Sequence, residues 1–176
     1  LSLSEVGVIL GLISGLSGAT GTFLGGFLAD RLGIRDMRWY IWIPMLGALS
    51  AMIPAYYTLL GDNTTLIIAA MIPLQILGAL YHGPCFATCH NLVSPGMLAM
   101  ASAILYFVLN IIGLGLGPLT VGILSDAFAD AYGENNLRYA MACTLTISLV
   151  GIFFLWMGAR SLKRDLQTNK QALISV

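Results

Sequence analysis

Five apolar stretches, each long enough to cross a lipid bilayer, constrain the fold of this chain more than any other feature of its sequence. A helix needs about 20 apolar residues to cross the roughly 30 Å hydrocarbon core. A closed barrel, the other structure that can span lipid, would show short stretches of alternating polarity, and this sequence lacks them. We therefore predict an all-α membrane protein, a bundle of five transmembrane helices. The predicted spans cover approximately residues 6–29, 39–60, 66–90, 98–125 and 139–159, and a tail follows at 161–176.

The charged residues predict how the chain lies in the membrane. Only 9% of the residues are charged, whereas a soluble domain carries about 25%. The net charge is zero, which leaves no basic stripe for phosphates and excludes a nucleic-acid partner. Basic residues favour the cytoplasmic side of short loops, so we predict an integral protein of the plasma (inner) membrane with a cytoplasmic carboxyl terminus. Seven of the eight basic residues fall on that side, namely Arg31, Arg35, Arg38, Arg160, Lys163, Arg164 and Lys170, and Arg138 falls on the other.

A short turn after the first span gathers charge at the edge of the membrane. Asp30, Arg31 and Arg35 lie within six positions, and Gly33 lies between them. An anion near a helix carboxyl terminus is disfavoured by about 0.3–1 kcal/mol, so Asp30 requires a donor. That donor is Arg31, Arg35 or the start of a neighbouring helix. The cluster is either a topology anchor or a latch that holds one helix arrangement and releases in another.

Glycine is concentrated in the first and fourth spans. In the first span, Gly7, Gly11 and Gly15 recur every four residues, a spacing that lets a neighbouring helix approach closely. The same face would also suit helices that slide or rock. Further along this span lie Gly18, Gly21, Gly25 and Gly26.

The fourth span contains a predicted breakpoint over residues 110–118, NIIGLGLGP. Proline removes one hydrogen bond from the helix and clashes with the preceding turn. Lipid tolerates such a break only against protein or a water-filled cavity. The residues of this breakpoint are Gly113, Gly115, Gly117, Pro118 and Gly122.

Polar residues inside the spans are few and uncharged. Such residues are costly in lipid and usually face the interior of the bundle or a cavity. The candidates are Gln75, Tyr81, His82, Cys85, Cys89, His90, Tyr106 and Asn110, of which Gln75, Tyr81, His82 and Asn110 are our predicted substrate-cavity residues.

A metal site is the alternative interpretation of four of these residues. His82, Cys85 and Cys89 share one helix face, and His90 follows directly; soft ligands in this arrangement could hold a transition metal. Ligands from a single helix rarely complete a coordination sphere, and Pro84 beside them fits a cavity wall. We therefore predict no metal site, no cofactor and no catalytic residue. A membrane-embedded metal-dependent enzyme or sensor stays open as the alternative class of function.

The turn at residues 26–35, GFLADRLGIR, resembles the signature turn of the major facilitator superfamily. The fourth span, with Asn110 and its glycines ahead of Ser125 and Asp126, resembles the eleventh helix of spinster-like facilitators. The resemblance implies that the five spans are helices eight to twelve, and that helix seven and the amino-terminal half belong to a longer protein. It also favours the latch, formed by Gly26, Asp30, Arg31, Gly33 and Arg35. Two departures are Ile34, in place of a second basic residue, and a loop at 94–98 without arginine.

These features predict a secondary active transporter that works by alternating access. Its partners would be the lipid bilayer, its substrate and the missing half of the same transporter. Few polar groups line this half, so we expect a lipid-like amphiphile such as a lysolipid or sphingoid. A small organic anion or sugar acid is the alternative substrate.

Overall fold

Helices make up all the regular secondary structure of the described residues. The computed structural model describes the backbone of residues 2–174 and the side chains of residues 2 and 4–162, so the side chains of Lys163, Arg164 and Lys170 lie outside the described residues. This confirms the predicted all-α membrane fold. The α-helices are α1 (Leu3–Gly33), α2 (Trp39–Leu60), α3 (Thr64–Ala79), α4 (His82–Asn91), α5 (Leu98–Val108), α6 (Gly117–Tyr132) and α7 (Asn136–Ile174). Shorter elements are the 3-10 helices η1 (Pro95–Met97) and η3 (Gly133–Asn135) and the π-helix η2 (Leu109–Leu116).

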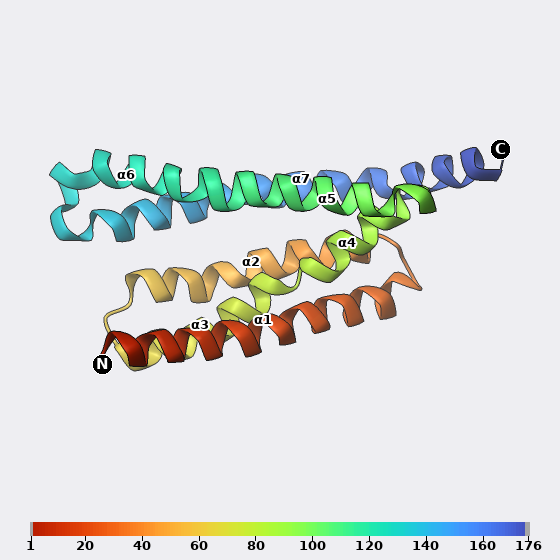
Figure 1. Ribbon diagram of the computed structural model, residues 1–176. Coiled ribbons are helices and arrows are strands. Elements are labelled where there is room, and N and C mark those ends of the chain that lie inside the picture. Colours follow the sequence, from red (N-terminus) through yellow and green to blue (C-terminus); the bar gives the residue numbers. More distant parts are fainter. Residues whose placement is uncertain (1, 175–176) are drawn as a thin grey trace.

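By length and composition, four continuous helical segments in the described residues could cross a membrane. The last of them, Pro95–Leu162, is 68 residues long. It folds back on itself around Gly133, so that α6 packs against α7 (Figure 1). Gly133 has a φ of +50°, which a glycine adopts without steric cost. This segment therefore contains two antiparallel arms, so the described residues provide five helical stretches that could cross a membrane.

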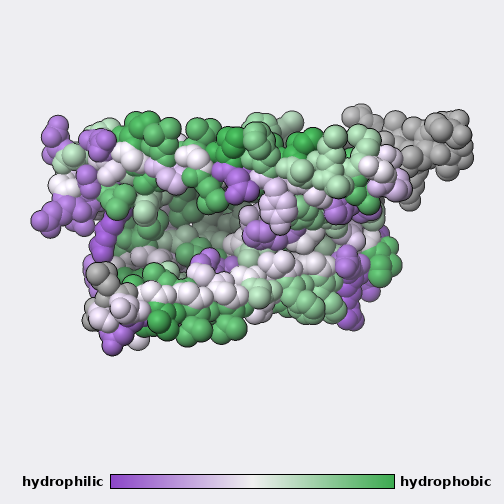
Figure 2. Space-filling view, viewed as in Figure 1, coloured by the Kyte–Doolittle hydropathy of each residue, from purple (hydrophilic) through white to green (hydrophobic). Residues whose placement is uncertain are grey.

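The helices form two layers (Figure 1). One layer holds α1, α2, α3 and α4, and the other holds α5, η2, α6 and α7. Helix α2 joins the layers because it packs against both α3 and α7. A hydrogen bond of 2.6 Å between the hydroxyls of Tyr56 and Thr146 ties α2 to α7. Polar residues gather mainly toward the two ends of the visible face, with apolar residues between them (Figure 2), which is the pattern a membrane span requires.

Only part of the glycine series on α1 packs closely. An added Cβ at Gly21 would collide with the backbone of α3 at Ile76, and one at Gly25 with the backbone of Leu80, which directly follows α3. At Gly7 a Cβ would meet nothing within 4 Å, and the same holds at Gly11, Gly15 and Gly18. Close packing is thus confirmed at Gly21 and Gly25, whereas the first four glycines of the series face open space in this chain.

Candidate functional site

The turn between α1 and α2 brings the ends of the two helices together. Helix α1 ends at Gly33, and the amides of Arg35 and Asp36 donate to the carbonyl of Leu32 at 3.0 and 3.2 Å. The backbone amide of Arg38 donates to Oδ1 of Asp36 at 3.0 Å, just before α2 begins. Five linking residues thus form a compact turn held by local hydrogen bonds, although Nε of Arg38 is buried without a hydrogen-bond partner among the described residues.

The donor to Asp30 is the start of the neighbouring helix. The hydroxyl of Tyr40, in the first turn of α2, donates to Oδ1 of Asp30 at 2.9 Å. Within the described part of the chain, no ion pair joins Asp30 to Arg31 or Arg35. Of the three donors expected from the sequence, the structure supplies the neighbouring helix start, through Tyr40, a side chain that the sequence did not single out. The sequence offers one signal for this contact: Asp30 and Tyr40 lie ten positions apart, on either side of the turn that joins the two helices.

Close contacts at the end of α1 require glycine at Gly33 of the turn motif and at Gly83 of α4. A Cβ at Gly33 would collide with the ring of Tyr40. A Cβ on Gly83, in α4, would lie 2.9 Å from the Cα of Gly26, which is shorter than real side-chain contacts allow. Gly83 therefore permits the close approach of α4 to α1, and Gly33 permits that of Tyr40, whereas a Cβ at Gly26 itself would meet nothing within 4 Å.

The four predicted substrate-cavity residues are not gathered in one site. Gln75 reaches across to α1, where its Nε2 donates to the hydroxyl of Ser14 at 2.8 Å. His82 lies with Nδ1 3.3 Å from the carbonyl of Ala79, and its ring stacks on Tyr81 with a centroid distance of 4.1 Å. Asn110 donates back to the carbonyl of Tyr106 at 2.7 Å.

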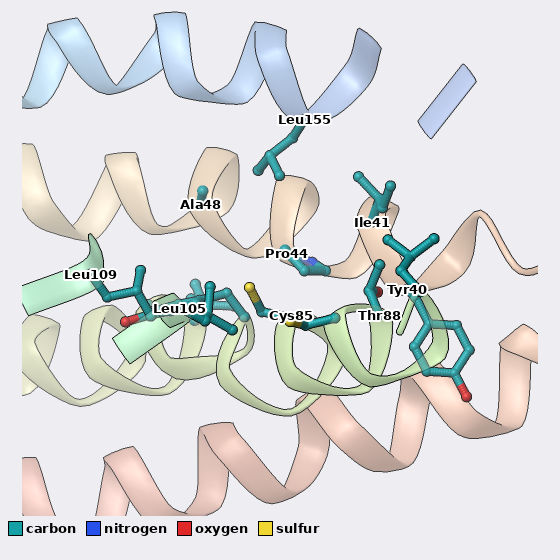
Figure 3. Close-up of a pocket in the computed structure, with 14 residues that line it drawn as sticks. Tyr40, Ile41, Pro44, Ala48, Cys85, Thr88, Leu105, Leu109 and Leu155 are labelled. Carbon is teal, nitrogen blue, oxygen red and sulfur yellow. The ribbon is translucent and has the colours of Figure 1, made fainter. Parts of the chain in front are cut away.

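Tyr81 alone of these four residues lines the largest of the described cavities. This cavity has a volume of about 590 Å³ and lies between α2, α4, α5 and α7 (Figure 3). Its walls are mainly apolar, with Pro44 and Leu155 on the side opposite Cys85 and Thr88. Cys89, one turn after Cys85, also lines it. A cavity of this size and composition suits an apolar body rather than a group that needs many hydrogen bonds.

The third transmembrane helix is interrupted beside this cavity. Helix α3 ends at Ala79 and α4 begins at His82. Pro84 does not cause this interruption, because the interruption precedes it. Pro84 lies in the first turn of α4, fully buried, where its missing N–H removes little helical bonding. The amide of Cys85 already restores the helical pattern by donating to the carbonyl of Tyr81 at 2.9 Å.

The fourth transmembrane helix is widened rather than bent at the glycine-rich stretch. Residues Leu109–Leu116 form η2, a π-helix that includes Gly113 and Gly115. Gly117 and Pro118 begin α6, and Gly122 lies within it. A π-helix bonds residues five apart, and this widened pattern lies directly before Pro118, which offers no N–H. The predicted breakpoint therefore corresponds to a change of helix type.

The residues of the alternative metal site are not assembled as ligands. In the described residues, no group of three or more His, Cys, Asp or Glu side chains could hold a metal ion. His90 instead lies with Nε2 2.7 Å from the hydroxyl of Ser102, which links α4 to α5. Cys85 and Cys89 are free thiols in the cavity wall.

Comparison with known proteins follows this geometry. No family model matches the chain. An MFS-type efflux pump of Mycolicibacterium smegmatis is 33% identical to it over 167 residues, which cover 94% of this chain and 39% of that protein. The fold is similar to the crystal structure of a bacterial homologue of the human lysosomal transporter Spinster, in an inward-facing and unoccupied conformation. That match has a TM-score of 0.80 and 24% identity, and it covers 94% of this chain and 42% of the other. The chain spans about two fifths of the length of each relative. The chain therefore has the fold of a major facilitator superfamily transporter, and its sequence is similar to that of an MFS-type efflux pump.

Proposed function

We propose that this chain is the part containing helices eight to twelve of a secondary active transporter that works by alternating access. One observation carries the proposal. Almost the whole chain matches the solved structure of a Spinster homologue in an inward-facing conformation. The relative of known sequence is described as an efflux pump. Helix seven and the amino-terminal half would come from the rest of the longer protein. The carboxyl terminus would lie in the cytoplasm.

The turn motif would act as the conformational latch of this transporter. Asp30 is exposed, so its partner can be exchanged without burying a bare charge. It is held by one hydrogen bond from α2. A contact of this kind can favour one of two helix arrangements by a few kcal/mol at most. Gly26, Arg31, Gly33 and Arg35 complete the latch, and the widened stretch from Gly113 to Gly122 would be the place where the fourth helix changes shape.

The substrate would be a lipid-like amphiphile, such as a lysolipid or a sphingoid. The side chains of Gln75, His82 and Asn110 each make a hydrogen bond within this chain, whereas Tyr81 lines the cavity and its ring stacks on His82. A buried polar group of a ligand that finds no partner costs about 1–3 kcal/mol. A sugar acid would leave several such groups unpaired here, whereas an acyl chain would leave none. The headgroup would be bound by the remaining half of the transporter.

Uptake by the full-length protein in liposomes tests both the proposed transport activity and the proposed class of substrate. A labelled lysophospholipid and a labelled sugar acid are supplied in parallel, and uptake is measured for the wild type, Tyr81→Phe and Tyr57→Phe. We expect saturable uptake of the lysophospholipid, a raised KM in Tyr81→Phe and no change in Tyr57→Phe, a tyrosine at the far end of α2. Saturable uptake of the sugar acid alone would replace the amphiphile with a small organic anion as substrate. Absence of uptake for both, with folded protein, would contradict the proposed substrates of the transporter.

A further inference from the structure

Tyr40 supplies the one hydrogen bond that holds Asp30 in the proposed latch, and its ring also packs against the apolar core. It lies in the first turn of α2 and donates to Asp30, in the last turn of α1, at 2.9 Å. We propose that Tyr40 is the positioning residue of the latch: its phenol, rather than the neighbouring arginines, places the Asp30 carboxylate, and Gly33 is glycine so that the ring can reach it. This inference rests on the proposed transport function.

The ring of Tyr40 is fixed from one side by the apolar core. The cluster of Ala29, Ile43 and Leu80 is buried, and Tyr40 packs against it together with Trp39 and Leu77. Ala29 is 0% exposed and directly precedes Asp30. The donor and the backbone of the acceptor are therefore both anchored in the same core, so the hydroxyl meets the carboxylate without ordering two long, mobile side chains.

Gly33 provides the second, independent observation. A Cβ at this position would lie 3.1 Å from Cδ2 of Tyr40 and closer still to Cε2. Any other residue would therefore push the ring away from the end of α1. Gly33 is therefore glycine for two reasons: the Tyr40 ring lies against it, and α1 ends there.

Tyr40 also lies next to α4 and α7, with which it lines a shared gap. With Thr88 and Asn91 of α4 and Leu162 of α7, it encloses a small gap, and its backbone side faces the large cavity. In Figure 3 the hydroxyl points away from Pro44 and Leu155 and toward the ribbon of α1. A displacement of α4 or α7 would therefore act on the Tyr40 ring, and through its hydroxyl on Asp30.

The chemistry of this contact distinguishes it from a latch made by arginine. An exposed ion pair weakens as salt rises, because the screening length falls from about 10 Å at 0.1 M to about 3 Å at 1 M. A hydrogen bond from a neutral phenol at 2.9 Å depends on contact geometry and responds little to salt. A latch set by Tyr40 is therefore expected to keep its strength across that range.

A mutant cycle on the full-length protein in liposomes tests the proposal without requiring a known substrate. The variants are Tyr40→Phe, Asp30→Ala and their combination, with Tyr57→Phe as the matched control. The readout is the ratio of inward-open to outward-open protein, measured by labelling single cysteines placed on either face, at 0.1 M and 1 M salt. We expect each single change to shift the ratio about tenfold, consistent with loss of one hydrogen bond to a charged group. The combination should shift it no further, and salt should leave the wild-type ratio unchanged.

Two further variants test the proposal through the position of the Tyr40 ring, in case loss of its hydroxyl destabilises the protein. Gly33→Ala should shift the ratio in the same direction as Tyr40→Phe, and it should have no further effect in a Tyr40→Ala background, where the ring is absent. An unchanged ratio in Tyr40→Phe, with a shift in Asp30→Ala that disappears at high salt, would overturn the proposal in favour of the arginines. Additive effects in the combination would overturn it as well. Coupling between Tyr40 and Asp30 without uptake of any tested solute would uphold the positioning role and count against the proposed substrates alone.

Discussion

Replacing Gly25 with alanine should separate α1 from α3 and destabilise the helical bundle. The added Cβ would collide with the carbonyl oxygen of Leu80 and lie 2.8 Å from its carbonyl carbon, whereas ordinary contact begins at 3.4 Å. The obstacle is backbone, which cannot turn aside as a side-chain tip can. The end of α3 must therefore move away from α1 at this point, and the two helices lose dispersion contacts along the interface.

The magnitude follows from two opposing effects. Overpacking of a close interface costs about 1–3 kcal/mol, and replacing a helical glycine with alanine returns about 0.5–1 kcal/mol. The net free energy of unfolding should fall by about 1–2 kcal/mol, so that the Tm falls by on the order of 2–6 °C for a unit of this size. Thermal unfolding of the full-length protein in detergent, followed by a thiol-reactive dye, measures this shift.

The matched control is Gly78→Ala on α3. A Cβ there would meet nothing within 4 Å, so only the gain in helix stability remains, and the Tm should stay equal or rise. A Tm of Gly25→Ala at or above that of the wild type would refute the close contact between α1 and α3. Equal losses in both variants would show that the loss arises from something other than the collision with Leu80.

Three further predictions concern topology, the widened helix and the joint between the layers. A cysteine in place of Arg35 should be labelled from the cytoplasm and one in place of Asp62 from outside, and labelling of both from the same side would exclude the five-span arrangement. Pro118→Ala returns an N–H to the end of the π-helix, so uptake should slow while substrate affinity stays the same; unchanged uptake would limit Pro118 to a packing role. Tyr56→Phe and Thr146→Val should each lower the free energy of unfolding by about 1 kcal/mol, because they remove the same hydrogen bond between α2 and α7, and fully additive losses would show that the two hydroxyls act independently.

The membrane itself explains why the sequence alone determined the fold class. In lipid every backbone polar group must be satisfied within the spanning segment, so apolar length predicts helices almost directly. The charged turn at Asp30 and Arg31 could be located for the same reason, since charge collects where a span leaves the hydrocarbon. The glycines of α1 predicted close packing, because small residues four apart share one face of a helix.

Only the tertiary structure decided which neighbours these groups meet. Periodicity identifies the face of a helix that carries a residue, but it does not identify the helix opposite that face. Gln75 was therefore expected in a substrate cavity and instead bonds to Ser14, 61 positions away. Tyr40 and Asp30 meet because the linking turn folds the two helix ends together. Contacts of this kind depend on distances of a few tenths of an ångström between helices, and these distances are set by the packing of the whole bundle.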